Sequence, residues 1–109
     1  RKEMIRLIAV GRLTEKMEVQ DVNGKKVCNF KLACRDNKET EYVRCTAWNE
    51  VAETMAKYTD RGSMLYVEGR YKTSSYVDGN TMQRHERIFI NIDKFEFITP
   101  QKKAEQTLV

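Results

Sequence analysis

Residues 41–48, EYVRCTAW, carry the side chains of this sequence that could do recognisable chemistry. In a β-strand, alternate residues point to opposite faces. One face would hold Val43, Cys45 and Ala47, and the other Tyr42, Arg44, Thr46 and Trp48. Aromatic rings stack on unpaired bases at about 1–3 kcal/mol per base, and cations neutralise phosphates. The second face is therefore suited to a single-stranded nucleic acid.

This strand taken alone has a second interpretation. Both of its faces could be buried, with the aliphatic stem of Arg44 crossing the apolar region so that its guanidinium reaches a carboxylate. The rest of the chain has to distinguish a binding surface from a buried strand.

Composition limits the class of protein. The 109 residues suit one domain, and 40% hydrophobic residues are too many for a disordered chain. A formal net charge of +4 is a mild bias toward polyanions. No apolar run approaches membrane-spanning length.

The three cysteines, at 28, 34 and 45, lack metal-ligand spacing and fall in apolar patterns. We therefore expect reduced, buried thiols in a cytosolic protein.

The hydrophobic pattern predicts five main strands and one helix. The strands are expected at 4–13, 27–35, 42–48, 64–77 and 85–98. Residues 15–22 alternate weakly and lead into Asn23-Gly24, which predicts a hairpin turn. After Trp48 the apolar spacing changes to three and four, which predicts a short helix with Asn49 as its N-cap.

The last two predicted strands carry further signals. Asp78-Gly79 predicts a second hairpin, and Gly69 a bend. The core face of 64–77 is expected to hold Leu65, Val67, Tyr71, Thr73 and Val77. Ile88, Ile90 and Ile92 are expected inside, and the later change of parity to Phe95 and Phe97 predicts a bulge near Asp93.

Five strands with a helix between the third and fourth is the element order of the OB-fold, an all-β, five-stranded Greek-key barrel. The open faces of three of these strands repeat the pattern of basic and aromatic side chains seen in 41–48. They supply Lys31, Arg35, Tyr42, Arg44, Trp48, Arg70, Lys72 and Tyr76. Agreement between three separate strands favours the binding surface over the buried strand.

Several segments also resemble the bacterial single-stranded DNA-binding protein family, including its phage- and plasmid-borne members. They are IAVGRLTEKMEV, NGKKVCNFKLA, YVRCTAW, KYTDRGS and LYVEGRYKTSSYVDGN, and the resemblance extends from about Ile5 to Ile98. It implies an OB-fold, a homo-oligomer that is usually a tetramer, and binding of single-stranded DNA without sequence specificity in replication, recombination and repair. It also implies a bacterial cytoplasmic, nucleoid-associated protein.

The resemblance assigns roles to individual positions. Stacking would fall to Tyr42, Trp48 and Tyr76, and phosphate contacts to Arg6, Arg44, Arg61 and Lys72. We add Arg12, which shares a face with Arg6, and Arg84, on the return strand of the second hairpin. That hairpin tip, residues 76–84, is polar and is expected to project, either as a mobile lip over DNA or as an assembly device.

The sequence departs from the family in several places. The loop after the second main strand is short and lacks the aromatic residue of many relatives. Ser74, Ser75 and Glu50 stand where relatives often have basic side chains. We expect a DNA-binding domain at 1–99 and the start of a tail at 100–109. The acidic tip through which relatives recruit replication and repair proteins does not occur in this sequence, either because the protein lost it or because the sequence stops before it.

Two other functions are alternatives to DNA binding. An enzyme needs converging acid, base or metal groups, and His85 is the single histidine, so neither catalysis nor a metal or other cofactor is expected. A stronger alternative is an OB-fold interaction subunit of the primosome type, which mainly docks proteins and buries Trp48 and Tyr76 in a subunit interface. Tight binding to homopolymeric single strands would separate the two.

Overall fold

The computed structural model of the chain describes residues 2–98. Within them, six strands and one helix follow in the order β1 (Arg6–Leu13), β2 (Gln20–Val22), β3 (Lys25–Asp36), β4 (Glu39–Trp48), α1 (Asn49–Tyr58), β5 (Met64–Val77) and β6 (Arg84–Phe97). The five long strands and the position of the helix agree with the prediction. The short β2 is an addition. The tail expected at 100–109 lies outside the described residues.

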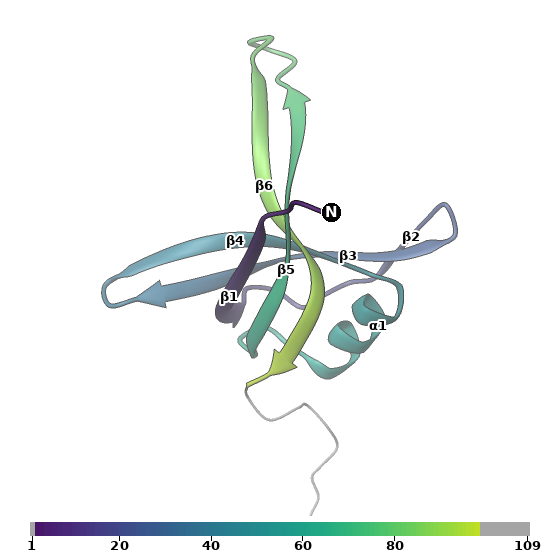
Figure 1. Cartoon of the computed structure of the whole chain (residues 1–109), viewed down its shortest axis with the longest axis vertical. Coiled ribbons are helices and arrows are strands. Elements are labelled where there is room, and N and C mark those ends of the chain that lie inside the picture. Colours follow the sequence, from purple (N-terminus) through teal and green to yellow (C-terminus); the bar gives the residue numbers. More distant parts are fainter. Residues whose placement is uncertain (1, 99–109) are drawn as a thin grey trace, which may run out of the picture.

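The strands form one strongly curved sheet, in the order β1-β5-β6-β4-β3-β2 (Figure 1). All neighbours are antiparallel except β4 and β6, which run parallel. The end of β1 also pairs with β3, Arg12 opposite Ala33 and Leu13 opposite Leu32, and this pairing closes the sheet on itself. The architecture is that of the predicted OB-fold.

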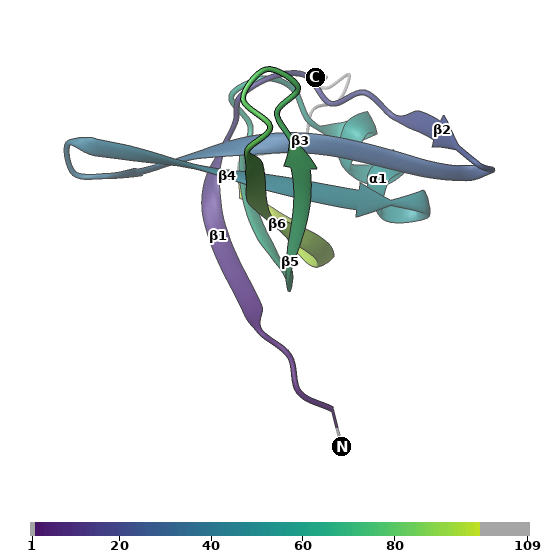
Figure 2. The same cartoon turned by 90° about the horizontal axis from the view of Figure 1, so that it is seen from above.

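The local turns explain how the strands reverse. Asn23 and Gly24 both have positive φ, 53° and 83°, as a two-residue hairpin between twisted strands requires. The predicted hairpin is confirmed. Figure 2 shows β3 and β4 as a long ribbon that continues beyond the barrel on one side. This ribbon reverses at Asn37, which also has a positive φ of 57°.

The core lies between the curved sheet and α1. Its fully buried side chains include Leu13, Leu32, Met55, Leu65 and Ile90. Two of the cysteines, at 28 and 45, are buried as expected, whereas the third, at 34, is only half-buried. Burial raises the pKa of the Cys45 thiol to about 12.

The start of α1 differs from the prediction. Asn49 does not cap the helix with its side chain; its Oδ1 instead accepts a hydrogen bond from the backbone N–H of Lys26 at 3.2 Å. This contact joins the start of α1 to β3. At the other end, the Lys16 ammonium donates to the carbonyls of Ala56 and Thr59 at 2.9 and 3.0 Å. A cation there is favourable because helix C-termini carry partial negative charge.

The predicted bulge is confirmed. Along β5 and β6, Glu68 pairs with Lys94 but Gly69 pairs with Ile92, so Asp93 is the extra residue. Gly69 allows the close approach at this point, because a Cβ there would lie 2.1 Å from the backbone oxygen of Asn91.

Beyond the bulge, β5 and β6 leave the barrel as a projecting two-stranded arm, residues 72–89 (Figure 1). Three inward assignments are wrong for this reason. Ile88 and Val77 are 49% and 58% exposed, and Thr73 is exposed as well. An isolated ribbon has no core on either face, so the alternating pattern does not bury its apolar side chains.

Candidate nucleic-acid interface

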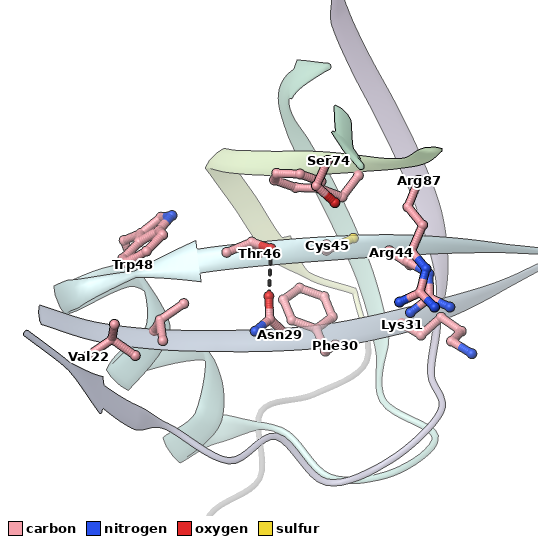
Figure 3. Close-up of a pocket in the computed structure, with 12 residues that line it drawn as sticks. Val22, Asn29, Phe30, Lys31, Arg44, Cys45, Thr46, Trp48, Ser74 and Arg87 are labelled. Carbon is pink, nitrogen blue, oxygen red and sulfur yellow. Dashed lines mark hydrogen bonds between the residues drawn. The ribbon is translucent and has the colours of Figure 1, made fainter. Parts of the chain in front are cut away.

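The outer surface of β3, β4, β5 and β6 is hollowed into a groove of about 650 Å³ (Figure 3). The side chains that line it belong to Val22, Val27, Asn29, Phe30, Lys31, Arg44, Cys45, Thr46, Trp48, Ser74, Arg87 and Phe89. Of the polar and aromatic face predicted for 41–48, Arg44, Thr46 and Trp48 line the groove, whereas Tyr42 does not.

Strand register places the floor of this groove. Asn29 on β3 lies opposite Thr46 on β4, and Thr46 Oγ1 donates a hydrogen bond of 2.7 Å to Asn29 Oδ1 (Figure 3). Thr46 is only 7% exposed although it belongs to the outward face of its strand. The bond satisfies both polar groups and links β3 to β4 between the two ends of the groove.

One end of the groove is apolar. Trp48 lies opposite Val27 in the ladder, and Val22 on β2 lines the same end. The indole is 38% exposed. Among residues 2–98, no other aromatic ring or cation stacks on it. A free, half-exposed ring on an apolar support can receive a planar base.

The other end is cationic. Lys31 and Arg44 lie opposite each other on β3 and β4, and the Arg87 side chain reaches the same end from β6 (Figure 3). None of the three forms an ion pair with a carboxylate in the described part of the chain. Like charges that converge without a counter-ion attract an anion from solution.

Two tyrosines predicted to stack on bases are each in contact with a cation. The Lys31 ammonium lies 5.9 Å from the centre of the Tyr42 ring, which is 63% exposed. The Arg87 guanidinium lies 4.6 Å from the centre of the Tyr76 ring. Tyr76 is also stacked with His85, at 5.2 Å between ring centres and 24° between planes.

The other predicted site residues lie outside the groove. Lys72 and Arg84 are on the projecting arm, where Arg84 donates to Ser75 Oγ at 3.3 Å. Arg35 is exposed on the β3–β4 ribbon and donates to the Asn37 carbonyl at 3.2 Å. Arg12 donates to the Gly62 carbonyl at 2.9 Å, and the exposed Arg61 precedes that glycine.

Arg6 and Arg70 lie opposite each other on the outer face of β1 and β5. The Arg6 guanidinium contacts the carboxylates of Glu68 and Asp93 at 3.1 and 2.8 Å. These contacts raise the pKa of Arg6, while the pKa of each carboxyl is lowered by hydrogen bonding. Arg6 therefore already has two anionic partners within the chain.

Arg87 and Phe89 were not among the predicted site residues. The alternation of β6 contained the signal: Arg87, Phe89 and Asn91 have the parity opposite to Ile88, Ile90 and Ile92. The parallel pairing of Arg44 with Phe89 then places this face beside β4. That pairing joins segments 45 residues apart and cannot be read from either strand alone.

Comparison with known proteins agrees with this geometry. A sequence profile of the single-strand binding protein family matches residues 4–98. The chain belongs to this family. The single-stranded DNA-binding protein of Halalkalibacterium halodurans is 32% identical over 93% of this chain and 64% of its own length. That of Oceanobacillus iheyensis is 34% identical over 71% of this chain and 54% of its own length. Single-stranded DNA-binding protein A of Bacillus subtilis is 29% identical over 88% and 60%, respectively.

This member of the single-strand binding protein family thus spans less than two thirds of the length of these relatives. Residues 2–98 contain no cluster of three or more histidine, cysteine or acidic side chains placed to hold a metal ion. The helix in this part of the chain, α1, has 10 residues, and no helix there is long and apolar enough to span a membrane.

Proposed function

We propose that the chain binds single-stranded DNA without sequence preference, in the groove on β3, β4, β5 and β6. The observation that carries this proposal is the difference between the two ends of the groove. One end has a free indole, and the other has cations that form no ion pair within residues 2–98. Every base offers a π-face and every nucleotide a phosphate, so such a groove accepts any sequence. Binding of this kind requires no catalytic group, and no cofactor is proposed.

The predicted residues take different roles in this proposal. Trp48 stacks on a base, and Lys31 and Arg44 contact phosphates beside it. Tyr42 and Arg35 extend the track along the β3–β4 ribbon. Lys72 and Arg84 extend it along the arm, where Tyr76 lies between them in the sequence. Four further arginines lie outside the groove and would contact only DNA that continues around the barrel. They are Arg6, Arg12, Arg61 and Arg70.

The proposed assembly is a homo-oligomer, with a tetramer as the expected state. Ile8 and Val10 on the outer face of β1 are 62% and 47% exposed, and Met4 and Ile5 just before the strand are exposed as well. Exposed aliphatic side chains that lie close together in this way favour association. We further propose action in the bacterial cytoplasm at the nucleoid during replication, recombination and repair. Proteins of those processes would be partners if an acidic tail follows residue 109.

Tryptophan fluorescence tests the proposed function directly, because Trp48 is the single tryptophan of the sequence. Poly-dT should quench its emission, and Trp48→Ala should weaken binding by about 1–3 kcal/mol. Trp48→Phe, which keeps a smaller ring, should lose less. Unchanged emission and no retention of DNA at saturating poly-dT would instead favour the interaction subunit of the primosome type.

A further inference from the structure

The cationic end of the groove contains Arg87, a residue that the sequence did not single out. We propose that Arg87 is a phosphate-binding residue of this site and that Tyr76 positions it, rather than stacking on a base. The inference rests on the proposed function, since it names the ligand group, a backbone phosphate, that this end of the groove receives.

Arg87 lies beside the other cations of the groove. Its guanidinium lines the groove together with Lys31 and Arg44, which come from two other strands (Figure 3). A guanidinium is a planar donor that can hold two phosphate oxygens at once. Within residues 2–98, no acidic side chain forms an ion pair with Arg87. Its hydrogen-bonding capacity is therefore free for an anion.

Two side chains of β5 accommodate Arg87. Its cross-strand partner is Ser74, whose small side chain also lines the groove and leaves room for the long arginine. The Tyr76 ring, two residues after Ser74 on β5, also contacts Arg87. The guanidinium lies 4.6 Å from the centre of this ring. Cation–π contacts of this kind favour one orientation of a flexible side chain.

The Tyr76 ring already has two neighbours. His85 stacks on it at 5.2 Å, and Arg87 lies over it as well. Both neighbours compete with a base for contact with this ring, whereas Trp48 has no such neighbour in the described part of the chain. Base stacking is therefore assigned to Trp48, and positioning of Arg87 to Tyr76.

The test is a double-mutant cycle on binding of an oligo-dT of about 16 nucleotides, the upper site size for one OB-fold. Affinity is measured over a range of salt concentrations for the wild type, Arg87→Gln, Tyr76→Leu and the double variant. Removing one phosphate contact should flatten the slope of log affinity against log salt by about 0.7. We expect this change in Arg87→Gln, and part of it in Tyr76→Leu. The double variant should bind no more weakly than Arg87→Gln alone.

Two further variants sharpen the comparison. Tyr76→Phe keeps the ring and should therefore have the same salt slope as the wild type. Lys57→Gln is a matched control, because Lys57 also lies over a tyrosine ring, that of Tyr58 at 5.4 Å, but on α1. Its slope should equal that of the wild type. Exposed side chains are changed throughout, so thermal unfolding should show that all variants are folded.

Each remaining outcome counts against the inference. If the wild type binds and Arg87→Gln keeps its full affinity and slope, Arg87 does not contact phosphate, while the proposed function stands. If Tyr76→Leu loses affinity at every salt concentration with an unchanged slope, and does so equally when Arg87 is absent, Tyr76 is a stacking residue. If the wild type does not bind oligo-dT, the proposed function fails, and this inference fails with it.

Discussion

Arg6 and Asp93 form a two-pronged ion pair, with guanidinium–carboxylate distances of 2.9 and 2.8 Å. The same guanidinium reaches Glu68 at 3.1 Å. The three residues belong to β1, β6 and β5, so the cluster ties these strands together at the bulge. The family resemblance assigns Arg6 to the phosphate contacts, but in the folded chain its guanidinium already pairs with two carboxylates.

This ion pair should make stability depend on pH. Hydrogen bonding to Arg6 lowers the pKa of Asp93. The pKa of Glu68 is lowered by the hydrogen bond from the Tyr66 hydroxyl and then by that from Arg6. The contribution to stability is therefore full above the unfolded-state values, about 3.9 for Asp and 4.3 for Glu, and is lost as the pH falls through the lower folded values. Arg6→Gln should reduce the free energy of unfolding in urea at pH 7, and the deficit should shrink at pH 3. Lys38→Gln, an exposed control in the turn between β3 and β4, should show neither effect. An equal deficit of Arg6→Gln at both pH values would contradict this assignment.

Lys72 should contribute to DNA binding through its charge. It is exposed at the base of the arm, opposite Phe89 of the groove. Lys72→Ala should flatten the salt dependence of poly-dT binding by about 0.7, with similar losses on all base compositions. Lys94→Ala removes the same charge from the outer face of β6, where it lies opposite Glu68, and should leave the slope unchanged. A wild-type slope in Lys72→Ala would exclude this lysine from the binding surface.

The apolar face of β1 should be required for assembly. Ile8→Glu would place a charge at a side chain that is 62% exposed in the single chain. Sedimentation should then show a smaller species than the expected tetramer, because a charge cannot be buried in an apolar interface at low cost. Val77→Glu is the matched control, since Val77 is 58% exposed but lies on the arm. A wild type that sediments at its chain mass of 12.8 kDa at micromolar concentration would contradict the proposed oligomer.

Gly69 should be intolerant of any side chain. Gly69→Ala would place its Cβ 2.1 Å from the Asn91 backbone oxygen, so the strands at the bulge would have to separate. We expect a loss of about 1–3 kcal/mol, as for other overpacked sites, measured by urea unfolding. Gly79→Ala at the arm tip meets no atom within 4 Å and should be close to neutral. Equal stability of the two variants would show that the bulge relaxes without cost.

Hydrogen exchange should reveal whether the arm binds DNA or assembles the protein. The tip closes through backbone hydrogen bonds between Asp78 and both Gln83 and Met82, at 2.8 and 2.7 Å, and is otherwise exposed. Amides of residues 76–87 should exchange rapidly in the free protein and slow when single-stranded DNA is added. High protection without DNA would identify the arm as an assembly device.

The parts of this protein that depend on local backbone geometry could be predicted from the sequence. Alternation in a strand is a property of the backbone itself, so the two faces of 41–48 were separable without knowing any neighbour. The Asn23-Gly24 turn is equally local. The bulge at Asp93 was visible because an extra residue reverses the parity of every residue after it, from Ile92 to Phe95.

Tertiary structure alone decided which of these faces meet and which of their charges are already paired. Ile88 and Ile90 have the same parity, yet only Ile90 is buried, because β6 extends past the end of the barrel. Arg6 and Asp93 are 87 residues apart, and Arg87 joins Arg44 only through the parallel pairing of β4 and β6. Long-range register sets these contacts, and register depends on how the closed sheet packs around one core rather than on the pattern within any single strand.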